Sequence, residues 1–308
     1  MRRFVIGVDG GGTHTRAVVL DESGRELGRA DGRAAVADAR TPRTAADAVA
    51  DVCAAAVAAA GRSLPVDSLW AGLSGAGREA ARSAVQMELT RMGVASEVRV
   101  DTDVAAAFHD AFGDGPGILL ISGTGSIAWG RAEDGRQGRV GGWGHHIGDE
   151  GSGYAIGLDA LRRVARHADG RAPQTHLQGL VLDHLGLERV DGLVHWAAAA
   201  SKAEVAALAA VVADASERSD EVAGEILVHA VEELEGHVLA ILKSLGPWEH
   251  PPTLALAGGL LRPGRPLRAP LLSLLGRHRL PVLNRPLDPA TGAARLALRG
   301  LDQRPLPL

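Results

Sequence analysis

Cysteine is almost absent from this chain. Its 308 residues include a single cysteine, Cys53. One thiol cannot build a disulfide framework, a cysteine-ligated structural zinc site or a cysteine-held iron–sulfur cluster within one chain. Cys53 lies in the alanine-rich run 52–56, which is typical of a helix face, so we expect a small, buried apolar residue there.

Basic clusters and long apolar runs are also missing. The formal net charge is −4, the sequence pI is about 6.3, and Lys and Arg are scattered, which argues against a nucleic-acid partner. Charged residues interrupt every apolar stretch well before 18 residues, and the first residues lead into a strand without a cleavable apolar segment. We therefore expect a cytoplasmic protein that binds neither nucleic acid nor a membrane.

The common phosphate-binding motifs do not occur. There is no Gly-x-x-x-x-Gly-Lys-Ser/Thr, and the glycines at 10–12 lead into a strand, whereas a dinucleotide fingerprint leads into a helix. Two other glycine-rich turns are present, at residues 9–13 and 122–126, each between β-branched runs. Each predicts a strand, a tight turn and a second strand.

These two turns could together bind one polyphosphate. Glycine permits positive φ and lets backbone N–H groups approach anionic oxygens. One such turn is more often a plain hairpin, but two turns that both carry hydroxyls favour phosphate binding. The expected contacts are Gly10, Gly11, Gly12, Thr13, Thr15, Ser122, Gly123, Thr124, Gly125 and Ser126. Asp9, directly before the first turn, could hold Mg²⁺ through its water shell.

The order of elements predicts an α/β protein of two domains with a ligand cleft. Strands are expected over 3–9, 14–20, 25–31, 67–73, 96–101, 117–121, 127–129 and 253–257. Helices are expected over 43–60, 79–92, from about 103, 155–168, 174–185, 191–199, 201–216, 219–245, 266–277 and 289–298. The first sheet should be mixed and covered on both faces, and the strand–turn–strand theme recurs after residue 117 as in a duplication.

Asp103 stands where a β run gives way to a helical run. Its carboxylate could project from the strand end into the cleft as a general base. The alternative is a helix N-cap, a common use of Asp at such a boundary.

Segment 141–153 contains six glycines, two histidines, one tryptophan and two acidic residues. Its glycines permit close backbone approach, Trp143 could stack on a ligand, and Asp149 and Glu150 could accept hydrogen bonds from polyol hydroxyls. Adjacent side chains at His145 and His146 do not easily face one metal ion and no third ligand is spaced for it, so hydrogen bonding or packing is favoured over zinc.

In this order, the motifs resemble the N-acetylglucosamine kinase branch of the actin-like ATPase superfamily, which is grouped with the BadF/BadG/BcrA/BcrD-type ATPases. Residues 9–13 and 122–126 match the two phosphate motifs, 257–259 the adenosine motif and 102–103 the catalytic aspartate. Segment 142–152 is the most specific match. The resemblance implies two ribonuclease-H-like domains: residues 1–103, with helix 289–300 packing back on them, and residues 104–288 with a helical insertion.

The resemblance also implies an ATP-dependent hexosamine kinase that uses Mg²⁺ and phosphorylates the 6-hydroxyl of N-acetylglucosamine or glucosamine. Asp103 would be the general base, Asp9 would organise Mg²⁺, and Gly258 and Gly259 would line the adenosine. The sugar contacts would be Ser74, Asp103, Gly142, Trp143, Gly144, His145 and Asp149. The motifs place no Arg or Lys as a phosphate clamp, so backbone amides and the metal would have to stabilise the transition state.

One departure from the amino-sugar kinase pattern leaves the identity of the substrate open. Val36 stands where the amino-sugar kinases carry a sugar-binding Asn, although Asp38, Arg40 or Ser74 could compensate. N-Acetylmuramate or another hexose derivative therefore stays a candidate, and so does a homodimer through the second domain. Two other functions fit the sequence less well. An ATPase activator would need two cysteines per subunit for a shared iron–sulfur cluster, and a non-catalytic sugar sensor would be expected to lack the base or a phosphate loop.

Overall fold

The computed structural model describes residues 3–302, and these form two compact units. Among the described residues, unit 1 comprises 3–114 and 287–302, and unit 2 comprises Gly115–Pro286. The boundary expected after residue 103 is therefore corrected: the helix that begins at Asp103 belongs to unit 1. The physical reason is that this helix packs against the last helix of the chain, which lies in the same unit.

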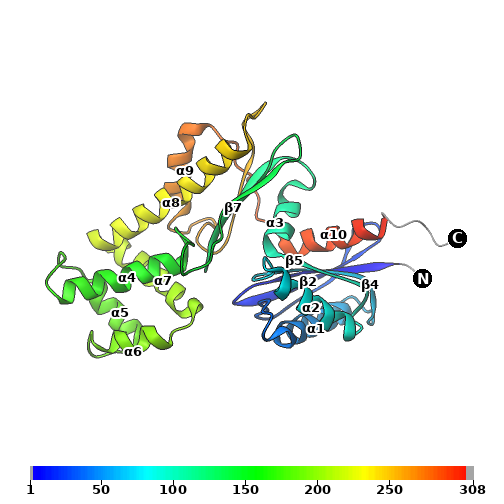
Figure 1. The fold of residues 1–308 in the computed structure, drawn as a ribbon, viewed down its shortest axis with the longest axis horizontal. Coiled ribbons are helices and arrows are strands. Elements are labelled where there is room, and N and C mark those ends of the chain that lie inside the picture. The colour runs from blue at the N-terminus through cyan, green and yellow to red at the C-terminus, as the bar shows by residue number, and fades with distance from the viewer. Residues whose placement is uncertain (1–2, 303–308) are drawn as a thin grey trace. The chain divides into compact units, whose positions relative to one another are not determined.

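Unit 1 is built on a five-stranded mixed sheet (Figure 1). Its strands, in spatial order, are β3 (Glu26–Arg33), β2 (His14–Asp21), β1 (Phe4–Gly10), β4 (Val66–Leu73) and β5 (Ala95–Thr102). The first three strands of the chain form the antiparallel meander that the sequence predicted, while β4 and β5 run parallel to β1.

Helices cover both faces of this sheet, as predicted. Helices α1 (Pro42–Ala59) and α2 (Glu79–Arg91) lie on one side, and α3 (Asp103–Phe112) and α10 (Pro289–Asp302) lie on the other (Figure 1). Alternate residues of β1 serve the two cores: Ile6 and Val8 pack toward α1, and Val5 packs toward α10. Cys53 is fully buried in α1, which confirms its expected role.

Unit 2 contains a four-stranded sheet. Its spatial order is β8 (Gln137–Gly141), β7 (Ser126–Arg131), β6 (Gly117–Ser122) and β9 (Leu254–Ala257), with β9 parallel to β6 and the other pairs antiparallel. Strand β8 was not predicted. Its sequence, Gln-Gly-Arg-Val-Gly, is a mostly polar edge strand without the apolar alternation that marks a half-buried one.

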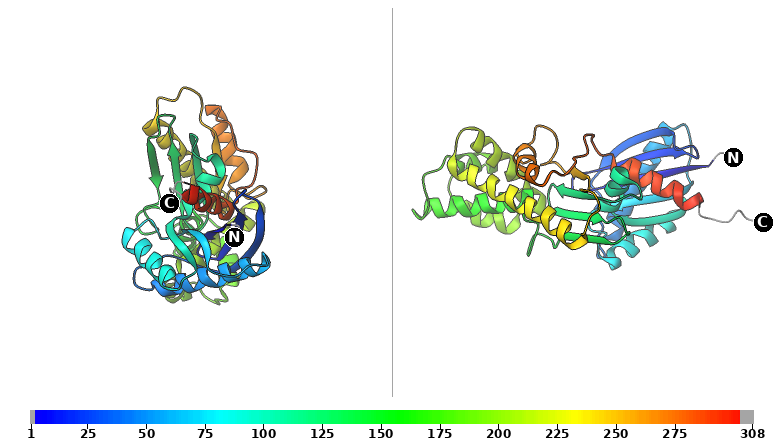
Figure 2. Two further views of the ribbon diagram at one scale, coloured as in Figure 1. Left: turned by 90° about the vertical axis from the view of Figure 1, so that its right-hand side faces the viewer. Right: turned by 90° about the horizontal axis from the view of Figure 1, so that it is seen from above.

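The remaining helices belong to unit 2 and lie within a few residues of their predicted positions. They are α4 (Gly153–Ala168), α5 (Leu177–Leu185), α6 (Gly192–Ala199), α7 (Lys202–Glu217), α8 (Glu221–Leu245) and α9 (Arg268–Leu275), followed by the short 3₁₀ helix η1 (Gly276–His278). Helix α8 runs alongside β7 and β8 (Figure 2), and α4 packs on α7. One apolar core joins the helices to the sheet.

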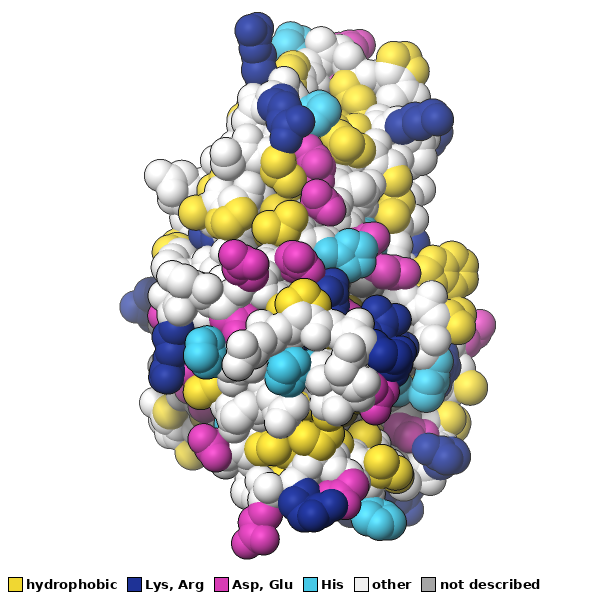
Figure 3. Space-filling view, turned by 90° about the vertical axis from the view of Figure 1, so that its left-hand side faces the viewer, with side chains coloured by type: hydrophobic (Ala, Val, Ile, Leu, Met, Phe, Trp, Pro, Cys, Tyr) yellow, Lys and Arg dark blue, Asp and Glu magenta, His cyan; other side chains and the backbone are white. Residues whose placement is uncertain are grey.

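The surface of the molecule carries charges of both signs. On the face in Figure 3, acidic and basic side chains are interspersed with short groups of hydrophobic ones, which is ordinary for a protein surface in water. Within residues 3–302, no helix is both long enough and apolar enough to cross a membrane.

Candidate active site

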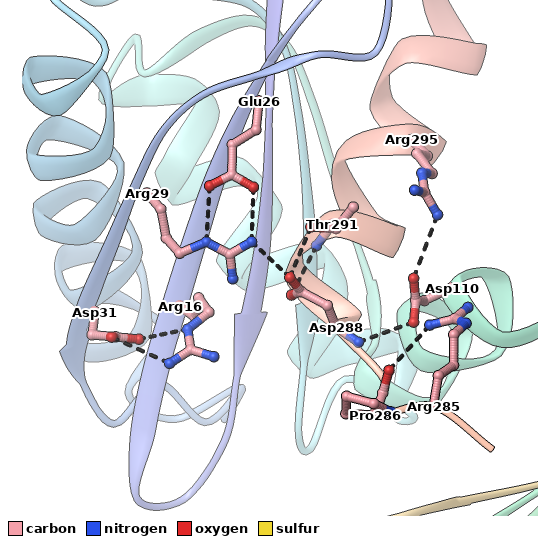
Figure 4. Close-up of polar contacts among 10 residues, drawn as sticks. All are labelled: Arg16, Glu26, Arg29, Asp31, Asp110, Arg285, Pro286, Asp288, Thr291 and Arg295. Carbon is pink, nitrogen blue, oxygen red and sulfur yellow. Dashed lines mark hydrogen bonds and ion pairs between the residues drawn. The ribbon is translucent and has the colours of Figure 1, made fainter.

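Asp9 lies near the end of β1 in unit 1. Side chains alternate along a strand, so Asp9 shares its face with Val5, the face that α3 and α10 cover. Arg16 of β2 stands directly opposite Asp9 in the strand pairing. Its guanidinium is held by Asp31, with Nε donating to Oδ1 at 2.7 Å (Figure 4). The result is a carboxylate and a cation side by side at the first glycine turn.

Asp103 is the first residue of α3, on the same side of the sheet. The N-cap of this helix is Thr102, whose hydroxyl oxygen accepts a hydrogen bond from the backbone N–H of Ala105 at 3.2 Å. The capping role considered for Asp103 is therefore filled by its neighbour. Burial raises the pKa of Asp103, although a hydrogen bond from the N–H of Val104 acts against this. Asp103 is thus a proton acceptor of increased basicity.

Asp9 has an unusually high pKa. Burial, followed by the negative charges of Asp103 and Asp288, raises the pKa of Asp9 to about 7, while Arg16 acts in the opposite direction. Carboxylates that repel one another in this way are stabilised by a cation. The first turn of unit 1 therefore carries a cluster of negative charge that favours a positive ligand.

Asp288 closes this cluster just before α10. Its Oδ2 accepts hydrogen bonds from Arg29 at 2.7 Å and from the hydroxyl of Thr291 at 2.9 Å (Figure 4). Burial opposes ionisation of Asp288, but these hydrogen bonds outweigh it and lower its pKa. Asp288 therefore stays charged and adds to the field at Asp9, a contribution that no sequence motif indicated.

A magnesium ion would suit this cluster. Within the described residues 3–302, no group of three or more His, Cys, Asp or Glu side chains could hold a metal ion by itself. A magnesium ion at Asp9 would thus take its other ligands from water and from phosphate oxygens. Mg²⁺ commonly binds proteins in this way, through one or two carboxylates and the phosphates of a substrate.

The first glycine turn is partly open to solvent. Gly12, Thr13 and His14 are exposed, whereas Thr15 is fully buried on the opposite face of the sheet, with Ala17 and Val19. The hydroxyl of Thr15 has no hydrogen-bond partner among the described residues. The predicted phosphate contact at Thr15 is therefore wrong, because strand alternation directs this side chain toward α1.

The second glycine turn is bound tightly to segment 141–153. The hydroxyl of Ser122 donates to the carbonyl of Gly151 at 2.8 Å, and that of Ser126 donates to the carbonyl of Glu150 at 2.6 Å. The N–H of Gly153 donates to the carbonyl of Gly123 at 2.8 Å. Two motifs that are separate in the sequence therefore meet in unit 2. Both serine hydroxyls act inside the protein, which corrects their expected role as phosphate donors.

The predicted adenosine turn meets the same hairpin. Gly258 has a φ of +89°, and a Cβ added there would overlap the carbonyl of Ser122, so only glycine fits. The N–H of Leu260 donates to that carbonyl at 3.1 Å. By contrast, a Cβ on Gly259 would meet nothing within 4 Å. The turn after β9 is thus fixed at Gly258 and open at Gly259.

Asp149 lies beside Gly125 of the second hairpin and forms an ion pair with Lys202. Asp149 is buried, and its Oδ2 accepts a hydrogen bond from Lys202 Nζ at 2.7 Å. This ion pair was not expected from the sequence, and the predicted contact of Asp149 with sugar hydroxyls stays a prediction. Lys202 was not predicted as a site residue, because it begins a helix far along the chain and belongs to no recognisable motif.

The other residues of the glycine-rich segment are more open. Trp143 is 64% exposed and lies under the guanidinium of Arg139, 4.7 Å from the ring centroid. Gly142 and Gly144 on either side have φ values of +68° and +88°. The rings of His145 and His146 pack against each other with centroids 4.0 Å apart. Packing was one of the two roles expected for them in preference to zinc binding. Burial, then His146 and Lys202, lowers the pKa of His145.

Val36 and Ser74 lie beside the first glycine turn. They form an isolated parallel bridge, in which the N–H of Ala37 donates to the carbonyl of Ser74 at 2.8 Å. The N–H of Ser74 in turn donates to the carbonyl of Gly10 at 2.8 Å. Val36 is exposed. Unit 1 therefore brings Ser74 close to the turn where Asp9 lies.

Comparison with known proteins gives consistent matches along the chain. An N-acetylmuramic acid/N-acetylglucosamine kinase of Clostridium acetobutylicum is 32% identical over 262 residues, which cover 84% of this chain and 86% of that protein. An N-acetyl-D-glucosamine kinase of Dictyostelium discoideum is 31% identical, covering 96% of this chain and 98% of the relative. A solved structure from Chromobacterium violaceum has a TM-score of 0.79 at 31% identity, covering 96% of this chain and 99% of that one.

A family model describes nearly the same span. The model of the BadF/BadG/BcrA/BcrD ATPase family matches residues 6–297, a range that includes both glycine turns, Asp103 and segment 141–153. The fold class predicted from the sequence, with its two ribonuclease-H-like domains of the actin-like ATPases, is confirmed. The chain belongs to the BadF/BadG/BcrA/BcrD ATPase family.

Proposed function

We propose that this protein is a kinase that transfers the γ-phosphate of ATP to the 6-hydroxyl of an amino sugar, N-acetylglucosamine or glucosamine. The observation that carries the proposal is the pair Asp9 and Asp103, two carboxylates of raised pKa that interact on one side of the sheet, beside the first glycine turn. The names of the relatives from Clostridium acetobutylicum and Dictyostelium discoideum support an amino sugar as substrate.

In the proposed reaction, Asp103 acts as the general base. It accepts the proton of the sugar hydroxyl as the oxygen forms a bond to the γ-phosphorus, while the bond to the β-phosphate oxygen breaks and ADP leaves. A base with a raised pKa holds the proton more readily, so burial of Asp103 supports this role. Bound magnesium would neutralise charge on the phosphates.

The phosphate and adenosine roles are assigned by exposure and contact. Gly11, Gly12 and Thr13 of the first turn are partly or fully exposed, and they are proposed to contact phosphate through backbone N–H groups and the threonine hydroxyl. Gly123, Thr124 and Gly125 are proposed to do the same at the second turn. Gly258 shapes the adenosine turn and Gly259 offers the open backbone there.

The proposed sugar contacts are residues that are partly or fully exposed to solvent. Trp143, with its exposed ring, is proposed to cover one face of the sugar. Ser74 and His145 are proposed as hydrogen-bonding partners, with Gly142 and Gly144 allowing close approach. Since Val36 carries no hydrogen-bonding group, the relative affinity for the acetylated and the free amino sugar is left for experiment.

The position of phosphorylation can be tested with a matched analogue. Purified protein is incubated with ATP and Mg²⁺ and either N-acetylglucosamine or 6-deoxy-N-acetylglucosamine, and products are followed by phosphorus NMR. A sugar 6-phosphate from the first compound and none from the second is expected. A phosphorylated product from the 6-deoxy compound would contradict the assignment of the acceptor hydroxyl.

A further inference from the structure

Lys202 is held firmly at the start of α7. A capping box fixes the beginning of this helix: the N–H of Glu204 donates to the hydroxyl of Ser201 at 3.3 Å, and Glu204 Oε2 accepts from the N–H of Ser201 at 2.7 Å. The helix packs closely on α4, where a Cβ at Gly157 would overlap the carbonyl of Val205. The backbone that carries Lys202 is therefore set by both its cap and its packing.

The ammonium group of Lys202 lies against the second glycine hairpin. A Cβ added at Gly125 would be 3.1 Å from Lys202 Nζ and 3.1 Å from Asp149 Oδ2. Lys202 and Asp149 are themselves joined at 2.7 Å. Asp149 has a φ of +64°, a conformation that is uncommon for a residue other than glycine. A buried carboxylate thus holds a cation at the tip of the hairpin.

The two partners of this ion pair differ in exposure. The side chain of Asp149 is 5% exposed and that of Lys202 is 34% exposed. An ammonium group has three N–H donors, and Asp149 Oδ2 accepts one of them. The Lys202 side chain is therefore partly open to solvent, and its ammonium has N–H donors beyond the one that the buried acid accepts.

The second glycine hairpin offers a phosphate ligand no full positive charge of its own. The hydroxyls of Ser122 and Ser126 donate to the carbonyls of Gly151 and Glu150, so they are not offered to a ligand. Backbone N–H groups remain, and they carry only partial charge. A lysine next to a glycine-rich loop supplies the full positive charge that phosphate oxygens favour.

We propose that Lys202 binds the phosphate chain of the nucleotide at the second glycine hairpin, and that Asp149 is the positioning residue that orients its ammonium. This inference rests on the proposed function, since it takes the hairpin to be the nucleotide site. It assigns to Asp149 a role through Lys202 beside the contact with sugar hydroxyls expected from the sequence.

Nucleotide titrations without sugar test the proposal. Calorimetry with Mg²⁺ compares adenosine, ADP and a non-hydrolysable ATP analogue on the wild type and on Lys202→Met. Affinity for ADP and for the ATP analogue should fall by about 10- to 100-fold, as expected for a charge-assisted contact, while adenosine affinity stays within about twofold. Equal losses for all three ligands, or no loss, would overturn the proposal, because a purely structural lysine would not distinguish them.

A double variant guards against loss of folding. Lys202→Met leaves Asp149 buried without its partner, whereas Lys202→Met/Asp149→Asn removes both charges together. The double variant should show the same selective loss toward ADP and the ATP analogue. Wild-type affinity for these ligands in a folded double variant would overturn the assignment.

Asp149→Asn separates the two roles considered for that residue. It keeps the ammonium but loosens its position, so affinity for the ATP analogue should fall by less than in Lys202→Met. Unchanged nucleotide affinity in a folded Asp149→Asn protein would overturn the positioning role, whereas a raised sugar KM would report the separate contact with sugar. If the wild type binds adenosine as tightly as ADP and the ATP analogue, the nucleotide site itself is misassigned and the proposed function fails before Lys202 is tested.

Discussion

At the scale of single residues, Asp9 and Asp103 share one functional group but occupy different positions. Asp9 lies near the end of a strand, opposite Arg16, whereas Asp103 begins a helix beside its capping residue Thr102. Helix N-termini favour a negative charge, yet burial keeps the pKa of Asp103 raised. These differences underlie the assignment of Asp103 to proton transfer and of Asp9 to the cation.

The role of Asp103 predicts a selective loss of turnover. Asp103→Asn removes the proton acceptor but preserves shape, so kcat should fall by about 10²- to 10⁴-fold. Nucleotide affinity should change little. Steady-state kinetics and calorimetry measure the two quantities, and turnover within a few-fold of the wild type would remove Asp103 from the mechanism.

The raised pKa of Asp9 predicts a dependence of stability on pH. Because the folded-state pKa is about 7 and the unfolded value is about 4, the folded protein holds a proton that the unfolded chain has lost between these values. The stability that this proton contributes is present below about pH 4 and is lost progressively as the pH rises toward 7. Asparagine does not ionise, so the Asp9→Asn protein should not lose stability in this way as the pH rises.

Chemical denaturation in the absence of Mg²⁺ measures this difference. The free energy of unfolding of Asp9→Asn relative to the wild type should rise by about 2–3 kcal/mol between pH 5 and pH 8. Mg²⁺ with nucleotide should stabilise the wild type more at pH 8 than at pH 5. In the variant, Mg²⁺ should add little to the effect of nucleotide alone. A difference that does not change with pH would show that Asp9 ionises normally.

At the scale of elements, close helix packing positions Asp103, the proposed catalytic carboxylate. Helix α10 crosses α3 with little space between them: a Cβ at Gly292 would overlap the carbonyl of Ala106 and lie 2.9 Å from the Cβ of Asp110. Asp110 also accepts a hydrogen bond from the N–H of Asp288 at 2.9 Å (Figure 4). The helix that begins with Asp103 is therefore anchored by the last helix of the chain.

Two glycines of α10 provide a matched test of this packing. Gly292→Ala should destabilise the protein by about 1–3 kcal/mol through overpacking and should lower kcat by displacing α3. Gly300→Ala adds the same methyl group where nothing lies within 4 Å, and it should be neutral or stabilising by up to about 1 kcal/mol. Equal melting temperatures for the two variants would contradict the proposed role of this contact.

Sequence patterns predicted most elements because strands and helices here keep clear periodicity. Strand β8 was missed, since its polar, glycine-containing sequence has no apolar alternation. The site was predicted less completely. Thr15 was misassigned because the face of a strand that is buried depends on the helices packed against it, and here α1 covers it.

Contacts between distant segments account for the other differences in the site. The hydroxyls of Ser122 and Ser126 looked free in the sequence, but each donates to a carbonyl of segment 141–153. Lys202 reaches the hairpin only because α7 packs beside α4. Local pattern contains no information about such partners, which arise from tertiary packing.

At the scale of the whole molecule, the proposed roles are divided between two compact units. Unit 1 holds the carboxylates Asp9 and Asp103, and unit 2 holds the second hairpin, the Gly258 turn and Lys202. Each unit has its own sheet and core. The division predicts separable defects: variants at Lys202 should weaken nucleotide affinity, whereas variants at Asp103 should lower kcat.

The measurement that tests the central claim most directly is sugar-dependent release of ADP. A coupled assay with ATP and Mg²⁺ compares N-acetylglucosamine, glucosamine, N-acetylmuramate, N-acetylmannosamine and glucose, with Asp103→Asn as the matched control. An amino sugar that accelerates ADP release far above the other compounds, with the acceleration lost in Asp103→Asn, is the predicted result. No acceleration by any sugar, or equal acceleration in the variant, would contradict the assignment of this protein as an amino-sugar kinase with Asp103 as its base.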